Sequence, residues 1–99
     1  MATRIRDVRE MVGLAATELS TLAGLSHGAL PHFERGDVSE MKFSSISSIA
    51  TVLGARVEFL MTGEGEAPTK ASALAAVEEA RRREAIRKRK HARAKRSVA

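Results

Sequence analysis

The sequence predicts an all-α fold, and three observations support that prediction. Apolar residues recur at helical spacing in successive short segments of residues 1–63. Five of the seven glycines fall at the joints between those segments, where they can end a helix or turn the chain. The last third of the chain is rich in alanine, arginine, lysine and glutamate, which are strong helix formers. We therefore expect a five-helix bundle over residues 1–63 and a helical extension, with no sheet.

Three short helices are predicted between residues 4 and 36. Ile5, Val8 and Val12 form an i, i+3, i+7 stripe on the first helix, which Gly13 can end. The second and third helices can cross and bury one small shared core, formed by Leu19, Leu22, Ala23, Leu30 and Phe33. Two short helices hinged at one glycine and closed by another have the layout of a helix-turn-helix.

The turn between the second and third helices is the most specific local pattern. Gly24 supplies the positive φ that a tight turn needs, and Leu25 fills the angle between the helices. Ser26 is a good N-cap, but a helix that starts there has Pro31 in its interior at a cost of about 3 kcal/mol. A later start leaves residues 27–29 as an extended turn and places Pro31 in the first helical turn, where proline is tolerated. Both starts remain open.

Two further helices complete the predicted bundle. After a loop at residues 37–42, a fourth helix ends at Gly54, with serines on its exposed side and an apolar face formed by Phe43, Ile46, Ile49, Ala50 and Leu53. A short fifth helix ends at residues 62–63 and contains Val57, Phe59, Leu60 and Met61. The three phenylalanines are expected to be buried. Residues 64–70 are small, polar and proline-containing, which indicates a linker.

Residues 71–99 are expected to form a basic helix or a partly disordered tail. The apolar positions do not sustain a heptad, so a coiled coil is not expected. From residue 81 onward there are 10 basic residues and one acidic residue, a net +9, whereas residues 1–80 have 7 basic and 11 acidic residues, a net −4. Such a segment can neutralise phosphates through Arg81, Arg82, Arg83, Arg87, Lys88, Arg89 and Lys90. The alternatives are a solvated end and docking on an acidic protein or an anionic membrane surface, the last of which the lack of aromatic residues in this segment disfavours.

The length and composition limit the function classes. A chain of 99 residues is too short to enclose a sizeable catalytic cavity, and the absence of cysteine excludes disulfides and thiolate metal sites. There is no glycine-rich phosphate loop, and His27 and His32 are too far apart around a helix to share a face. No apolar run approaches the roughly 18 residues of a membrane span. We expect a soluble cytoplasmic protein that is not an enzyme and holds no metal or cofactor.

Several short motifs together resemble a known family. They are Leu22-Ala23-Gly24-Leu25-Ser26 at the turn, Phe33-Glu34-Arg35-Gly36 after it, Leu53-Gly54, and Phe59-Leu60-Met61-Thr62-Gly63. With them, about two thirds of the chain resembles the Xre or Cro/C1-type helix-turn-helix, the lambda-repressor-like DNA-binding domain of bacterial and phage regulators. The resemblance implies a transcriptional repressor or autoregulator that binds double-stranded DNA as a homodimer. It also implies a dimer interface on the fifth helix, at Val57, Phe59, Leu60 and Met61.

The resemblance assigns DNA contacts to individual residues. The third helix would lie in the major groove, with His27, Gly28 and His32 toward the bases and Ser26 and Arg35 on phosphates. The full expected DNA surface is Thr17, Ser26, His27, Gly28, Ala29, His32, Arg35 and Lys42. The basic residues of the tail would add phosphate contacts and a steep salt dependence.

The chain departs from the family pattern in ways that keep other functions open. Ala15-Ala16 replaces a polar cap and a DNA-contacting glutamine at the start of the second helix, and Thr17 substitutes for them only in part. Gly28 and Pro31 weaken the third helix as a regular helix. A second class is therefore a protein-interaction module, an antitoxin or anti-activator with the same fold. A third is RNA binding by the arginine-rich tail, although Tyr and Trp, which stack on bases, are absent.

Overall fold

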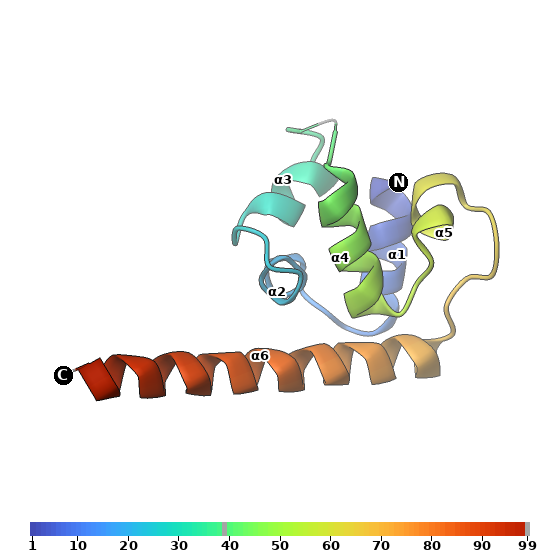
Figure 1. Cartoon of the computed structure of the whole chain (residues 1–99). Helices are drawn as coiled ribbons and strands as arrows, with labels where there is room; N and C mark the ends of the chain where they lie inside the picture. The colour runs from blue at the N-terminus through green and yellow to red at the C-terminus, as the bar shows by residue number, and fades with distance from the viewer. Residues whose placement is uncertain (39, 99) are drawn as a thin grey trace.

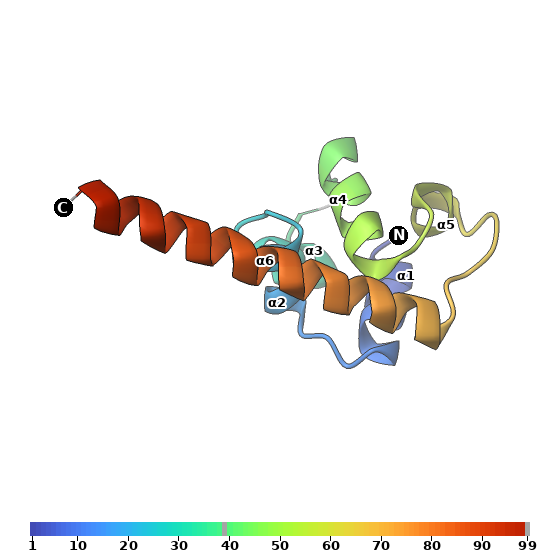
Figure 2. The ribbon, with the colours of Figure 1, turned by 60° about the horizontal axis from the view of Figure 1, so that its bottom comes forward.

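The computed structural model describes residues 1–38 and 40–98, and the side chains of those residues up to residue 90. In that part of the chain it contains six helices and no strand, so the prediction of an all-α fold is confirmed (Figure 1). The helices are α1 (Ala2–Met11), α2 (Ala16–Leu22), α3 (Ala29–Glu34), α4 (Phe43–Leu53), α5 (Val57–Thr62) and α6 (Lys70–Val98). The five short helices form a bundle, and the long α6 lies across one end of it (Figures 1 and 2).

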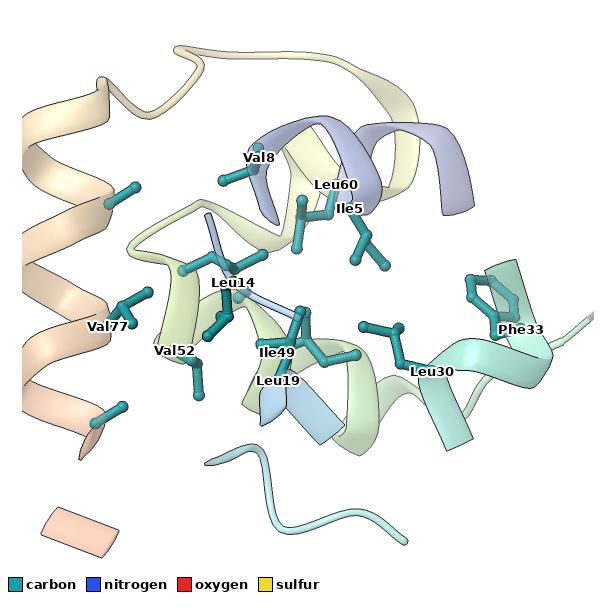
Figure 3. Packing of buried hydrophobic residues seen from close by; sticks show 14 residues of the cluster. Ile5, Val8, Leu14, Leu19, Leu30, Phe33, Ile49, Val52, Leu60 and Val77 are labelled. Atoms are coloured by element: carbon teal, nitrogen blue, oxygen red, sulfur yellow. The ribbon is translucent and has the colours of Figure 1, made fainter. Parts of the chain in front are cut away.

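The core of the bundle receives side chains from every helix. Ile5, Leu19 and Leu30 have no exposed surface, and with Val8, Leu14, Phe33, Ile49, Leu53 and Leu60 they form one cluster (Figure 3). Each large aliphatic side chain buried in this way stabilises the fold by about 1.5–3 kcal/mol relative to exposure. Most of the periodic apolar positions of the sequence therefore form the core, with Val12, Leu22 and Ala23 partly buried against it, and this core sets the positions of α2 and α3.

The first half of α6 belongs to the same core. Ala73, Val77 and Ala80 lie at i, i+4 and i+7 on one face of α6 and are 0%, 1% and 6% exposed. This face covers Val52, which is only 4% exposed although the sequence analysis did not include it in the apolar face of α4. The sequence-based division at residue 63 therefore separates two segments that share one hydrophobic cluster.

One glycine allows α6 to lie close to the bundle. Gly54 ends α4 with φ +64°, a left-handed conformation that L side chains rarely adopt. A Cβ atom at this position would lie 2.9 Å from Cβ of Ala76 and 3.2 Å from the carbonyl oxygen of Ser72. Gly54 therefore serves both as the helix end that the sequence predicts and as the surface on which α6 packs.

The prediction that Phe43 is buried is wrong. Its side chain is 64% exposed at the first turn of α4, whereas Phe33 is buried and Phe59 is half-buried. The side of the helix on which Phe43 lies is not the reason, because Ile46 and Ala50, at i+3 and i+7 from Phe43, are both only 2% exposed. The reason is its place along the helix: Phe43 is the first residue of α4, at the end away from α6, and the core covers this stripe only further along (Figure 1).

The third helix begins late. Its first residue is Ala29, and Gly28 is its N-cap; Ser26 is not the cap, because its backbone carbonyl only accepts the Ala29 N–H in the preceding turn at 3.0 Å. Pro31 is then the third helical residue. Since the first N–H groups of a helix have no partner within the helix, the missing N–H of Pro31 breaks no helical hydrogen bond. Of the two starts that the sequence left open, the structure has the later one.

Candidate nucleic-acid interface

One buried hydrogen bond sets the position of α3 against α2. The Leu30 N–H donates to Oγ of Ser20 at 3.0 Å, and this hydroxyl donates to the carbonyl oxygen of Ala16 at 2.9 Å. Ser20 has no exposed surface. The Leu30 N–H is one of the helix-end donors that need a partner outside the helix, so Ser20 supplies the partner that the capless start of α3 lacks. The sequence analysis missed Ser20, whose only signal is a hydroxyl next to the buried Leu19.

The turn between α2 and α3 has the conformation that its glycine predicts. Gly24 has φ +76°, and the Leu25 N–H donates to the Ser20 carbonyl oxygen at 2.8 Å, which closes the end of α2. Leu25 is half-buried against the core cluster. The backbone of this turn and the Ser20 hydroxyl together fix the angle at which α3 leaves α2.

The helix α3 has two chemically distinct faces. Leu30 and Phe33 point into the core (Figure 3), whereas the side chains of His32 and Arg35 are 54% and 61% exposed. His27 and Ser26 are exposed in the turn that precedes the helix. These four of the predicted DNA contacts are therefore on the side of α3 that the bundle leaves accessible.

The exposed face of α3 carries a small cluster that the sequence analysis missed, formed by His32, Arg35 and Asp37. Oδ2 of Asp37 lies 3.1 Å from Nδ1 of His32 and accepts from Nε of Arg35 at 3.2 Å. Nη2 of Arg35 lies 2.9 Å from the same Nδ1. Because Nδ1 can accept from Arg35 or donate to Asp37, but cannot do both at once, the two contacts belong to different tautomers or protonation states of the ring.

Asp37 is an anion in this cluster. Hydrogen bonding by His32 and then by Arg35 lowers the pKa of the Asp37 carboxyl below its ordinary value. A phosphate is the same kind of acceptor as this carboxylate, so it can replace Asp37 as the partner of Arg35 and His32. Arg35 and His32 are therefore held together on the surface by the Asp37 carboxylate, in positions where they can bind an anion.

Gly28 lets the His32 ring lie against the backbone at the start of α3. A Cβ atom at Gly28 would be 3.3 Å from Cδ2 and 3.4 Å from Nε2 of His32, which is a tight contact. Any side chain at this position would push the ring outward. Gly28 has a low helix propensity, but its lack of a side chain helps to position the imidazole ring of His32.

The far end of α3 is tied to α1. Nη2 and Nε of Arg9 donate to the two carboxylate oxygens of Glu34 at 2.6 and 3.0 Å, and Nη1 donates to the carbonyl oxygen of Leu14 at 2.9 Å. Both side chains are largely buried, at 13% and 10% exposure. This bidentate pair fixes the C-terminal end of α3, as Ser20 fixes its N-terminal end.

Most of the predicted DNA-contacting residues gather at one groove. A groove of about 650 Å³ runs between α3, the loop after it and the start of α4. Five of the predicted residues line it, namely Ser26, Gly28, Ala29, His32 and Lys42. His27 and Arg35 are exposed outside its lining, and Thr17 lies on the first turn of α2, away from it.

Part of the basic segment of α6 is engaged with the protein itself. Nε and Nη2 of Arg81 donate to the two carboxylate oxygens of Glu18 at 2.9 and 3.0 Å, which joins α6 to the first turn of α2. This hydrogen bonding lowers the pKa of the Glu18 carboxyl and raises the pKa of Arg81. Arg87 pairs with Glu84 at 2.7 Å and Arg82 with Glu79 at 3.2 Å, both within α6.

Four basic residues of this segment have no ion pair with any side chain that the structure describes. They are Arg83, Lys88, Arg89 and Lys90, and all four are exposed. These side chains and the three paired arginines make residues 81–90 the most strongly basic surface of the described chain, with seven basic residues and one acidic residue.

The residues predicted for a dimer interface are divided between core and surface. Leu60 has no exposed surface, and its carbonyl oxygen accepts from Nε of Arg4 at 3.2 Å. Met61 is 42% exposed, and Val57 and Phe59 are half-buried. Of these four predicted residues, Val57, Phe59 and Met61 can therefore present apolar surface to a second protomer, and Leu60 cannot.

Comparison with known proteins adds no assignment. No protein-family model, curated protein or solved structure matches the chain. None of the helices described is long and apolar enough to cross a membrane. Within the same residues, no three His, Cys, Asp or Glu side chains come together as a metal ion would require.

Proposed function

We propose that this protein is a sequence-specific regulator of transcription of the Xre type, which binds double-stranded DNA as a homodimer. The observation that supports it best is the two-faced α3. Its inner face is held by Leu30 and Phe33 and both its ends are tied down, while His32 and Arg35 are left on the accessible side. A short helix supported in this way can lie in a major groove, because its outer side chains are free to meet base edges.

Each exposed residue has a distinct role in this proposal. His32 donates from a ring nitrogen to a base edge. Arg35 gives up its hydrogen bond to Asp37 and donates to a phosphate oxygen instead. His27 and the backbone at Gly28 lie next to the bases at the start of α3, while Lys42 supplies a charge across the groove. The basic part of α6 adds affinity that does not depend on sequence. Homodimerisation through Val57, Phe59 and Met61 doubles the surface that reads DNA.

Binding to the protein's own promoter DNA and to a scrambled duplex, over a salt series, tests the proposal. The full chain should prefer the promoter. Arg35→Ala should weaken binding to all sequences and reduce the salt slope by about one, whereas His32→Ala should relax the preference at one or two base pairs. Lys70→Ala is a matched control, because it removes one exposed cation at the start of α6, away from α3 and outside the residues of the proposed dimer interface (Figure 1). If all three variants bind like the parent chain, the assigned surface is wrong.

A second candidate function is a protein-interaction module. It is favoured by the apolar part of the groove beside α3, where Leu25, Phe33 and Met41 contribute to the lining and Val38 is 48% exposed. Residues 1–80, which carry a net −4, suit a basic protein partner better than a phosphate backbone. The salt series distinguishes the two, since this candidate predicts no preference for the promoter over the scrambled duplex.

A further inference from the structure

The helix α6 is attached to the bundle by two independent kinds of contact. Ala73, Val77 and Ala80 are buried in the core, and Arg81 makes the bidentate ion pair with Glu18 of α2. The side chain of Glu84, one turn further along the same face, is only 15% exposed. The attachment therefore extends over more than three turns, to Glu84, and overlaps only the start of the basic surface of residues 81–90.

Beyond this attachment α6 continues without a helix breaker. No glycine or proline occurs from Lys70 to Val98, and the helix is continuous over these 29 residues. The part from residue 85 to 98 has a length of roughly 20 Å at 1.5 Å per residue. Figures 1 and 2 both show it extending past the bundle on the side where α2 and α3 lie. Since an α-helix bends only gently, the anchored half sets the direction of the projecting half.

The projecting half starts beside α2 and the turn that follows it, and near one of the predicted DNA contacts, Thr17. Glu18, which Arg81 holds, is next to Thr17 on the first turn of α2. Lys88 lines a small groove with Glu18 and Thr21, and on the other side of α6, Arg83 and Arg87 line a groove with the turn at Gly24. The basic side chains thus flank the helix-turn-helix instead of facing away from it.

From this placement we infer that residues 86–90 of α6, at the start of its projecting half, form a rigid arm that binds phosphates of the same duplex at one fixed distance from the site of α3. This inference rests on the proposed function and adds to it the direction of the arm. Double-stranded DNA fits better than other anionic partners. The segment has no aromatic side chain to stack on single-stranded bases, and its single large apolar residue, Ile86, is too little to insert into a membrane surface.

The direction of the arm can be uncoupled from its charge. Three glycines inserted between Ala85 and Ile86 keep every basic residue but break the helix after its attachment. The matched control is the same insertion between Gly65 and Glu66, in the linker before the attached part of α6. Because the chain contains no cysteine, spin labels can be placed on Thr3→Cys and Ile86→Cys, both exposed positions, in all three chains.

Without DNA, the distance between the labels should be narrowly distributed in the parent chain and in the linker control, and broad after the insertion at residue 85. A broad distribution in the parent chain would overturn the inference. With promoter DNA, hydroxyl-radical footprinting of the parent chain should show one discrete protected position beside the main site. The insertion at residue 85 should spread this protection over several positions and weaken DNA binding several-fold.

The two proposals fail in different ways. The inference about the arm is overturned alone if the protection beside the main site is the same in all three chains. It is also overturned alone if the parent chain protects the main site but no position beside it. Absence of any promoter-specific protected site in the parent chain refutes the proposed function, and the arm with it.

Discussion

Replacing Ser20 with alanine tests whether one hydroxyl holds α3 in place. The substitution leaves the Leu30 N–H without its partner, and because Ser20 has no exposed surface, bulk water cannot replace the hydroxyl without opening the contact between α2 and α3. A buried donor left without a partner costs about 1–3 kcal/mol. Alanine regains roughly 0.5 kcal/mol because it is the better helix former. We therefore expect Ser20→Ala to lower the free energy of unfolding by about 0.5–2.5 kcal/mol.

Urea unfolding, followed by circular dichroism, measures this change. In a chain of this size each kcal/mol corresponds to roughly 4–8 °C in Tm, so thermal unfolding gives a second measurement of the same loss. Ser48→Ala is the matched control. The Ser48 hydroxyl donates to the carbonyl oxygen of Ser44 at 3.0 Å within α4, as Ser20 does within α2, but it has no hydrogen bond to another helix. The same stability change in both variants would refute the reasoning.

Three further results are expected. Gly54→Ala should destabilise the protein more than Gly13→Ala, because both glycines have positive φ but only at Gly54 would the new Cβ meet α6. Urea unfolding measures the difference in the free energy of unfolding. Equal losses in the two variants would contradict the close packing of α6. The lowered pKa of Glu18 means that its contribution to stability is present above the pKa of the unfolded chain and is lost as the pH falls through the folded value. The stability of the parent chain should therefore fall more steeply than that of Glu18→Gln below about pH 5, and parallel urea midpoints over that range would argue against this ion pair. Asp37→Asn should tighten DNA binding more than Glu40→Gln, which removes the same charge from the same loop; equal gains in a titration would mean that Asp37 acts only through its charge.

The periodic pattern of apolar residues predicted the helices well, because each short helix needs one apolar face whatever its partner is. Ile5, Leu19, Leu30 and Phe33 were assigned to the core from spacing alone, and all four are buried. Gly24 was likewise placed in the turn, since its conformation is a property of the local chain.

Positions whose burial depends on a distant partner were not predicted in this way. On the C-terminal helix, large apolar residues were a poor guide: Val77 is buried, but so are Ala73 and Ala80, whereas Ile86 is 49% exposed. Alanines do not indicate a buried face by themselves, because alanine is also common on exposed helices as a good helix former. Phe43 was misplaced for a related reason: it shares a stripe with the buried Ile46 and Ala50, but spacing within α4 cannot show that the core ends before the first turn of the helix.

In the candidate site too, features that depend on local spacing were predicted, and features that depend on contacts formed in the folded chain were not. Spacing and resemblance assigned His32 and Arg35 to the exposed face of the third helix, and both side chains are exposed. Their common partner Asp37 was missed, because a hydrogen-bonding cluster depends on how the chain leaves the helix and not on helical period. The start of α3 was left open between two positions, since the cap preference of Ser26 and the cost of Pro31 oppose each other locally.

The sequence by itself determined that this protein is all helical, roughly where the short helices of residues 1–63 lie, and that its positive charge is concentrated at one end of the chain. Those properties depend on residues a few positions apart. Only the tertiary structure decided that α3 starts at Ala29, that Ser20 and Glu34 hold its two ends, and that the first half of α6 is part of the core. The reason is that these features depend on contacts between segments that are distant in the sequence, such as the ion pair of Glu18 and Arg81. They also depend on close packing, which at Gly54 leaves no room for a side chain.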